Sequence, residues 1–359
     1  MLPQAVLAQP FHLPRGGVVK NRVCKSAMSE ALGTRQGRAT PELARLYGAW
    51  ADGGVGLCIT GNVMIDRRAL GEPGNVVIED DSQMAELQAW AQAATRNGTH
   101  CWVQLNHPGK QAPKGLNKEN VAPSAVPFRK DMQAFFPTPR ELTDAEVREL
   151  IARYGRAAGI VKRAGFTGVQ IHGAHGYLVS QFLSPHHNQR SDEWGGSAEK
   201  RRRFVLAVLA AMRAEVGADF PIGIKLNSAD FQRGGFTEEE SLDTIRALAE
   251  AGIDLIEISG GTYEAPAMTG VKTAGAPVKD STRQREAYFL AFAEKARQAV
   301  SVPLVVTGGF RSLEGMATAL TSGAVDLVGL ARAVAIEPDV VNRLLAGQAP
   351  REQVRPIKT

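Results

Sequence analysis

A short pattern recurs along the chain: an amphipathic stretch is followed by a glycine and then by a run of apolar residues. Four clear copies read ADGGVGLCIT (51–60), RAGFTGVQIH (163–172), AGIDLIEIS (251–259) and SGAVDLVGL (322–330). A helix that ends at glycine and leads into a strand buried on both faces gives this pattern. The chain is therefore expected to alternate helices with parallel strands.

Further apolar runs at 22–28, 99–106, 221–227 and 302–307 bring the predicted strands to eight. Helical periodicity occupies 41–52, 82–97, 144–164, 198–216, 238–251, 283–299, 313–322 and 339–346. Thr143, Ser197 and Thr237 precede three of these helices as N-cap residues. The α/β pattern is typical of a closed (β/α)8 TIM barrel. A doubly wound sheet is the alternative, but no GxGxxG motif opens any of the helices.

Three other features complete the expected architecture. Gly16 and Gly17 indicate a short N-terminal hairpin that covers the bottom of the barrel. Long loops at 108–142 and 173–196 follow the third and fourth strands, on the face where barrels keep their active sites. Because no linker or change of composition divides the chain, residues 1–359 are expected to form a single domain.

The composition argues against several classes of protein. With 42 Lys and Arg against 37 Asp and Glu, the formal charge is +5, and only the run 200–203 concentrates it. That run is expected on a solvated helix face, and without a reading motif no nucleic-acid partner is predicted. Cys24, Cys58 and Cys101 form no CxxC pair, which argues against a zinc ribbon or an iron–sulfur cluster. Free cysteines in apolar runs are typically buried.

The sequence gives no indication of export or of a membrane partner. The first nine residues lack the charged and apolar regions of a signal peptide. No run of about 18 uninterrupted apolar residues is present to span a membrane. A soluble, cytoplasmic protein is therefore expected. The sequence is compatible with a homo-oligomer and does not fix the oligomeric state.

The run IHGAHGY (171–177) places His172, His175 and Tyr177 at the mouth of the predicted barrel. The two histidines could be metal ligands, although no third ligand follows at a suitable spacing. They could also be structural, each bonded to a carbonyl, or they could donate to an oxygen on which negative charge develops. Tyr177 would then be a proton donor. In its structural alternative, Tyr177 caps a helix that runs to Phe182.

Small residues after the seventh and eighth strands favour a phosphorylated ligand. The seventh strand leads into Gly308 and Gly309, and the eighth leads into Ala331 and Arg332. Backbone N–H groups at a helix N-terminus bind anions, and barrels frequently hold a phosphate at this place. Turns alone also require glycine, so the signal is moderate.

Gln104 and Lys225 are polar residues within the otherwise apolar third and fifth strands. A lysine inside a barrel is costly unless it meets an anion or a polar ligand. The two residues therefore indicate a ligand inside the barrel mouth, with an exposed strand end as the alternative.

Longer motifs accompany these residues: KNR (20–22), SAM (26–28), GLCITG (56–61), QLNHPG (104–109), QIHGAHGYLVSQFLSP (170–185), NQRSDEWGGS (188–197) and GIKLNSADFQRGGF (223–236). In this order, over about 10–338, they resemble the old yellow enzyme family of FMN-dependent reductases that use NADPH or NADH. The resemblance implies a TIM barrel with bound FMN, a nicotinamide reductant and a small-molecule substrate.

The resemblance also implies which residues contact the cofactor. Four residues after the first strand would line the isoalloxazine ring: Ser26, Ala27, Met28 and Ser29. The backbone of Asn62 would meet the flavin, and Gln104 would hydrogen-bond its pyrimidine edge. Lys225 matches a basic residue beside N1 and O2, where a cation stabilises the anionic reduced flavin. The 5′-phosphate would be held by Gly308, Gly309, Ala331 and Arg332.

The activity that the resemblance implies is reduction of an α,β-unsaturated carbonyl compound, an enone or enal. His172 and His175 match the pair that binds the carbonyl oxygen, Tyr177 matches the proton donor, and the hydride would come from flavin N5. Two alternatives stay open: another flavin redox reaction, such as dehydrogenation or demethylation, and a non-catalytic flavin sensor. Ser29 departs from a frequent Thr or Cys that tunes the flavin potential, and Asn106 replaces a frequent Trp.

Overall fold

The computed structural model describes residues 1–265, 278–310 and 312–348, and it describes 278–287 by their backbone alone. Three parts of the predicted single domain, 266–277, 311 and 349–359, therefore lie outside the described residues. No helix in the described part of the chain is both long enough and apolar enough to cross a membrane.

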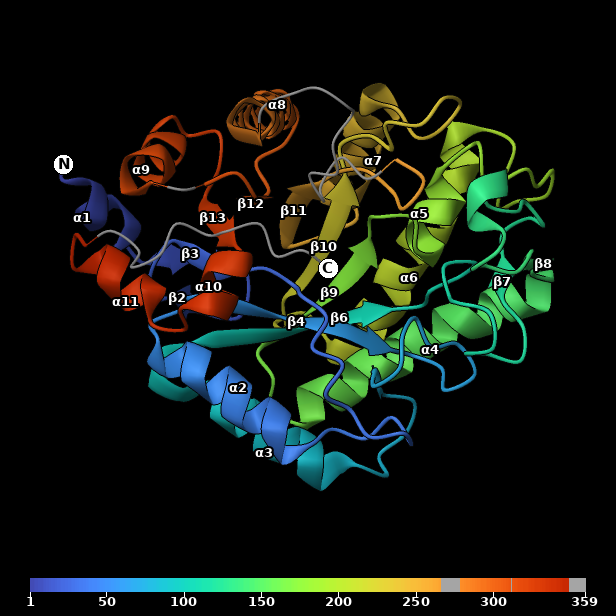
Figure 1. Ribbon diagram of the computed structural model, residues 1–359, viewed down its shortest axis with the longest axis horizontal. Coiled ribbons are helices and arrows are strands. Elements are labelled where there is room, and N and C mark those ends of the chain that lie inside the picture. The colour runs from blue at the N-terminus through green and yellow to red at the C-terminus, as the bar shows by residue number, and fades with distance from the viewer. Residues whose placement is uncertain (266–277, 311, 349–359) are drawn as a thin grey trace.

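Eight parallel strands close into a barrel that helices surround (Figure 1). They are β3 (Val23–Lys25), β4 (Leu57–Met64), β6 (His100–Asn106), β9 (Gly168–Gly173), β10 (Ile222–Asn227), β11 (Leu255–Ser259), β12 (Leu304–Thr307) and β13 (Leu327–Leu330). Strand β3 pairs with both β13 and β4, and this double pairing closes the ring. The predicted barrel is therefore confirmed, and the doubly wound sheet is excluded.

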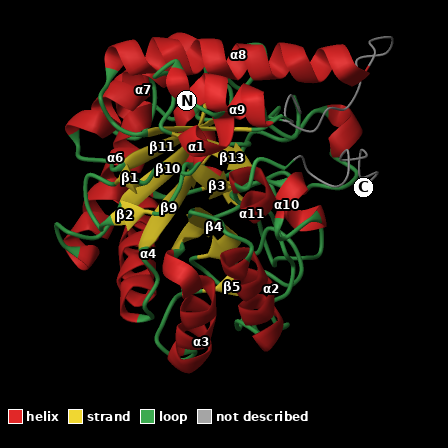
Figure 2. Ribbon diagram, turned by 90° about the vertical axis from the view of Figure 1, so that its left-hand side faces the viewer, coloured by secondary structure: helices red, strands yellow, loops and turns green. Residues whose placement is uncertain are grey.

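The helices predicted from periodicity are present on the outside of the barrel (Figure 2). They are α2 (Pro41–Asp52), α3 (Met84–Ala94), α4 (Asp144–Arg163), α6 (Ala198–Val216), α7 (Glu238–Glu250), α8 (Val278–Ala299), α9 (Leu313–Thr321) and α11 (Val340–Leu345). The three predicted N-caps are confirmed, because each side chain accepts a backbone N–H of the first turn. Thr143 and Thr237 also form complete capping boxes with glutamates.

Several short elements carry too few residues to show periodicity in the sequence. Helix α1 (Pro3–Leu7) packs against α9 and α11, and α5 (Leu178–Leu183) and α10 (Arg332–Ile336) follow β9 and β13. Strand β5 (Val76–Val77) extends the sheet beside β4, and β7 (Val121–Ala122) pairs with β8 (Arg140–Glu141) inside the long third loop. The predicted hairpin is confirmed as β1 (Phe11–His12) paired with β2 (Val18–Val19).

The basic run 200–203 does not lie wholly on a solvated face, and that prediction is wrong for Arg201. Arg201 is 6% exposed, and its guanidinium donates to the carbonyls of Leu183 and Gly196 and to the carboxylate of Glu240. It lies in the first turn of α6, where the helix meets the end of α5. One position of an otherwise partly exposed run therefore joins α6 to the end of α5, to the loop before α6 and to the first turn of α7.

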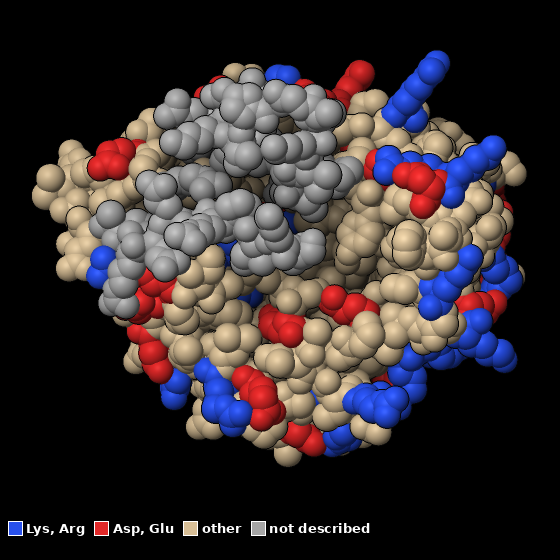
Figure 3. Space-filling view, viewed as in Figure 1, with Lys and Arg blue, Asp and Glu red and all other residues tan. Residues whose placement is uncertain are grey.

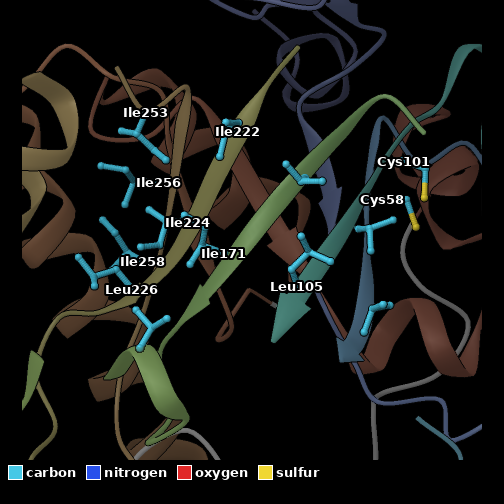
Figure 4. Packing of buried hydrophobic residues seen from close by; sticks show 14 of the residues in the cluster. Cys58, Cys101, Leu105, Ile171, Ile222, Ile224, Leu226, Ile253, Ile256 and Ile258 are labelled. Carbon is cyan, nitrogen blue, oxygen red and sulfur yellow. The ribbon is translucent and has the colours of Figure 1, made fainter. Parts of the chain in front are cut away.

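Side chains alternate along the strands between two cores. Figure 4 shows part of the larger core, with Ile222, Ile224 and Leu226 of β10 among its members. The smaller core includes Trp102 and Leu255. The three cysteines are buried and free, as expected, and Cys58 lies beside Cys101 on neighbouring strands (Figure 4).

Trp102 fills the space left by two glycines on neighbouring strands. A Cβ at Gly168 would lie 2.5 Å from the indole Nε1, and a Cβ at Gly223 would lie 2.8 Å from Cζ3. Both distances are below any real Cβ contact, so these strand glycines are required by packing. The bottom of the barrel is thereby sealed by an aromatic ring.

Substitution of Gly168 by alanine should therefore destabilise the barrel. We expect Gly168→Ala to lower the free energy of unfolding by about 1–3 kcal/mol, since overpacking forces the indole or the strand to move. Thermal and urea unfolding measure the effect. The control is Gly159→Ala in α4, whose new Cβ would meet Glu215 and Arg163 no closer than 3.2 Å, with the flexible end of Glu215 as its nearest neighbour. Equal melting temperatures for the two variants would contradict this account of the packing.

Candidate active site

A cavity of about 240 Å³ lies at the carboxyl ends of the barrel strands. Its lining is Ala27, Met28, Ser29, Gly61, Asn62, Gln104, His172, His175, Tyr177, Lys225, Gly260, Gly261, Thr262 and Tyr263. In Figure 3 the surface is hollowed near its middle.

Most of the residues singled out from the sequence meet at this one cavity, although they come from five strands or the loops after them. Ser26 lies just behind the lining, where its Oγ is 2.5 Å from Thr307 Oγ1. The four residues predicted to hold a phosphate do not line the cavity itself. The loops that carry them follow β12 and β13, which are paired neighbours, so they lie together at the same end of the barrel.

The phosphate candidates combine two glycines of positive φ with an exposed cation. Gly308 and Gly309 have φ values of 100° and 86°, which favour glycine at both positions. Arg332 is exposed and begins α10, with Ala331 at its N-cap position. Backbone N–H groups and a guanidinium at the edge of the barrel suit an anionic group.

The polar residues of the strands form a buried network rather than an exposed edge, so that alternative is wrong. Gln104 and Lys225 are 1% and 3% exposed. Gln104 Nε2 donates to Gln170 Oε1 at 2.7 Å, and Gln170 Nε2 donates to Glu257 Oε2 at 2.7 Å. Lys225 Nζ lies 3.1 Å from Glu257 Oε1.

Glu257 remains ionised at the centre of this network. Burial raises the pKa of its carboxyl group, but the charge of Lys225 and the hydrogen bonds from Thr307 and Gln170 outweigh burial. The pKa therefore lies below its usual value. Thr307 Oγ1 donates to the carboxylate at 2.6 Å. Neither Gln170 nor Glu257 was among the residues singled out, although each interrupts an apolar strand as Gln104 and Lys225 do.

His172 presents a neutral imidazole. Its Nδ1 accepts the N–H of Ala174 at 3.4 Å, which places the ring proton on Nε2. Burial lowers the pKa of His172 well below the usual range, and the neighbouring His175 and Lys225 lower it further. His172 therefore acts as a hydrogen-bond donor at neutral pH, without a positive charge.

His175 is held by its backbone and by a serine. Its φ of 61° lies in the left-handed region, which is uncommon for a residue other than glycine. Its N–H donates to Asn227 Oδ1 at 3.2 Å, and its Nε2 lies 2.6 Å from Ser259 Oγ. In the tautomer in which the serine hydroxyl donates to Nε2, the ring proton lies on Nδ1. Burial lowers the pKa of His175 to about 3.

The geometry does not favour a metal at this pair. Among the described residues, no group of three potential ligands includes His172 or His175. The one such group consists of His186, His187 and Glu264. Lys110 Nζ lies 3.5 Å from Glu264 Oε2, so a cation already stands beside that carboxylate.

Tyr177 directs its hydroxyl toward other side chains and not to the helix. It occupies the N-cap position of α5 without a side-chain cap, so the helix-cap interpretation is wrong. Asn62 Nδ2 donates to its hydroxyl at 3.4 Å, and Tyr263 Oη lies 3.3 Å away. Because Asn62 is the donor, the phenol keeps its own proton to give. Burial raises the pKa of Tyr177 well above the usual value, so the phenol is neutral.

Tyr263 was not predicted as a site residue, and the loop after β11 brings it there. The loop is fixed by the next residue, Glu264, whose Oε1 accepts the N–H of Arg129 at 2.8 Å. The side chains of Glu264 and Lys110 are 4% and 2% exposed and form a buried ion pair. The segment 257–263 belongs to the resemblance, but the place of the Tyr263 side chain depends on a contact between distant loops, which the sequence alone does not show.

Comparison with known proteins identifies relatives along nearly the whole chain. The family model described as "NADH:flavin oxidoreductase / NADH oxidase family" matches residues 7–350. The NADH-dependent flavin oxidoreductase iliE of Hypocrea jecorina is 39% identical over 353 residues, which cover 92% of this chain and 86% of that protein.

Two solved structures share the barrel. The old yellow enzyme homologue from Zymomonas mobilis has a TM-score of 0.82 at 26% identity and covers 97% of this chain and 94% of its own. A 2-naphthoyl-CoA reductase in complex with 2-naphthoyl-CoA has a TM-score of 0.87 at 26% identity and covers 96% of this chain. This chain spans only 53% of that reductase.

Acidification should destabilise the protein through the two site histidines. An unfolded imidazole has a pKa of about 6.5, whereas the folded pKa is about 3 for His175 and well lowered for His172. Below about pH 6.5 the unfolded chain therefore binds protons that the folded protein does not bind. The free energy of unfolding should fall as pH drops, by up to about 1.4 kcal/mol per pH unit for each imidazole.

Urea unfolding at about pH 7.5, 6 and 5 measures this decline. The double variant His172→Gln with His175→Gln lacks both titrating groups, and its free energy of unfolding should fall less steeply with acidification. Parallel curves for the two proteins would show that these imidazoles do not titrate as described.

Proposed function

Because the chain belongs to the NADH:flavin oxidoreductase / NADH oxidase family, the old yellow enzymes, it is an FMN-dependent oxidoreductase with NADH or NADPH as reductant, and we propose that it reduces the activated C=C bond of enones and enals. The observation that carries the proposal is the meeting of His172, His175 and Tyr177 at one cavity. Their rings are neighbours: the ring centroid of His172 lies 5.3 Å from that of His175 and 4.7 Å from that of Tyr177.

The residues around the cavity fit FMN. A flavin ring carries carbonyl oxygens and an imide N–H along one edge, and the floor offers the Lys225 ammonium and the Gln104 amide. Among the described residues, Glu257 is the only charged partner of Lys225, which leaves ammonium protons for a ligand. Small and apolar residues, Ala27 and Met28, line another part of the cavity. We assign the cofactor contacts to these residues together with Ser26, Ser29 and Asn62.

The bound FMN supplies hydride to the substrate, and the protein supplies position and charge stabilisation. His172 donates through Nε2 and His175 through Nδ1 to the carbonyl oxygen of the substrate. Charge grows on this oxygen as the double bond is reduced, so donors placed beforehand stabilise the transition state more than the ground state. One such donor typically contributes about 3 kcal/mol.

Tyr177 provides the proton that completes the reduction. Its phenol is neutral and accepts a hydrogen bond from Asn62, so its proton is directed elsewhere. A flavin sensor without a small-molecule substrate would need neither the two oriented donors nor this phenol together. The reaction is tested by assaying the holoenzyme with NADH and NADPH against 2-cyclohexenone and cinnamaldehyde. Oxidation of either nucleotide without formation of a saturated product would contradict the proposal.

Removing the Tyr177 hydroxyl should separate the two half-reactions. We expect Tyr177→Phe to be reduced by NADH or NADPH at nearly the normal rate, because that step needs no phenol. Reoxidation by 2-cyclohexenone should slow by at least tenfold, since the proton must then come from water. Stopped-flow absorbance follows both steps. The control is His172→Ala, which should weaken binding of phenolic ligands. Equal slowing of both half-reactions with an early melting transition would assign Tyr177 a structural role.

Arg332 should contribute to FMN binding through the phosphate alone. We expect Arg332→Ala to weaken binding of FMN to the apoprotein by about tenfold, because one charge-assisted pair is lost. Binding of riboflavin, which has no phosphate, should be unchanged. Quenching of flavin fluorescence measures both affinities. An equal loss for the two ligands would place the effect of Arg332 in the fold and not at the phosphate.

A further inference from the structure

Glu257 is the end point of two series of hydrogen bonds. One runs from Gln104 through Gln170, and the other runs from Ser26 through Thr307. The carboxylate of Glu257 is 1% exposed as part of β11 and has no proton to donate. On one side Gln170 Nε2 donates to Oε2, and on the other Thr307 Oγ1 donates to Oε1. The ammonium of Lys225 lies beside the same oxygen, Oε1. Every polar contact of this carboxylate is therefore with a donor.

Because the Glu257 carboxylate can only accept, it fixes which group donates in every preceding hydrogen bond of the series. Since Gln170 gives its amide N–H to Glu257, its Oε1 is the atom that receives Gln104 Nε2. Gln104 lines the cavity, and its Oε1 is then left as an acceptor for a ligand. An amide can otherwise turn by half a revolution and exchange its donor and acceptor.

The second series has the same polarity. Thr307 gives its hydroxyl proton to Glu257, so it can only accept from Ser26, whose Oγ lies 2.5 Å away. Ser26 is the residue that joins β3 to the cavity lining at Ala27 and Met28. The orientation of both hydroxyls therefore also depends on the carboxylate.

Glu257 additionally cancels the charge of Lys225. Their side chains are 1% and 4% exposed, and a pair of opposite charges this close contributes almost no net charge to the space above it. An unpaired buried ammonium would act at full strength in these surroundings, where the local dielectric constant is low. Lys225 thus approaches a ligand as a donor of hydrogen bonds more than as a free cation.

We propose that Glu257 is a positioning residue that sets both the hydrogen-bonding pattern and the net charge of the cofactor-binding floor. It makes Gln104 an acceptor for the imide N–H of the flavin edge, and it holds the reduction potential of the bound cofactor lower than Lys225 alone would. The inference rests on the proposed FMN site. It assigns no contact with the substrate to Glu257.

The test compares Glu257→Gln with wild-type protein and with Thr307→Val, a control that keeps both the carboxylate and Lys225. A glutamine can donate as well as accept, so Gln104 is no longer fixed. We expect the apoprotein of Glu257→Gln to bind FMN at least tenfold more weakly. We also expect it to lose the preference of wild type for FMN over 3-methyl-FMN, whose imide nitrogen has no proton. Thr307→Val should keep that preference.

The reduction potential tests the charge separately. In Glu257→Gln the uncompensated Lys225 should favour reduced over oxidised FMN by about tenfold, a positive shift of about 30 mV for a two-electron couple. In Lys225→Met the carboxylate of Glu257 has lost its cation, so the reduction potential should shift in the negative direction. The double variant Lys225→Met with Glu257→Leu removes both charges and should return close to wild type. If the single variants do not fold, the double variant still tests whether the two charges compensate each other.

Distinct results separate this inference from the proposed function. If wild-type apoprotein does not bind FMN, the cofactor assignment itself fails. If wild type binds FMN but Glu257→Gln keeps its affinity, its discrimination against 3-methyl-FMN and its potential, only the role of Glu257 is overturned. Equal potentials for Lys225→Met and the double variant would likewise overturn the charge compensation.

Discussion

Closure of the barrel is the constraint on which the remaining structure depends. Once β3 pairs with both β13 and β4, side chains that face inward are removed from water, and their polar groups must find partners inside. Gln104, Gln170 and Glu257 satisfy this requirement by bonding in sequence inside the barrel, from β6 to β9 and from β9 past β10 to β11. The requirement for satisfied hydrogen bonds thus places an ordered set of donors and acceptors beneath the cavity before any ligand arrives.

The barrel interior changes character along its axis. Trp102 and its apolar neighbours seal the bottom, the polar network occupies the middle, and the histidines lie at the mouth. Successive residues of each strand point inward and outward in turn. The outward residues pack against the helices, so the inward residues are free to be apolar at the bottom and polar higher up. The buried polar floor would face a bound cofactor, and the residues at the mouth would face a substrate that exchanges.

The loops at the mouth are held by buried charges and by backbone conformation. Glu264 receives Arg129 and stands beside Lys110, which ties the loop of Tyr263 to the long loop after β6. His175 keeps its left-handed backbone because Asn227 and Ser259 bind it from the next strands. Both imidazoles are neutral, so the site offers directed hydrogen bonds in place of positive charge.

The sequence by itself determined the barrel, the positions of its strands and long helices, and most of the side chains at its mouth. These follow from local signals: glycine after an amphipathic run, apolar strands, and N-caps such as Thr143. The tertiary structure alone decided the direction of the hydrogen bonds and which charges compensate each other. Arg201 turned inward, Glu257 became the partner of Lys225, and Tyr263 reached Tyr177. Each of these contacts joins residues far apart in the chain, and their geometry exists only after closure has brought the strands and loops together.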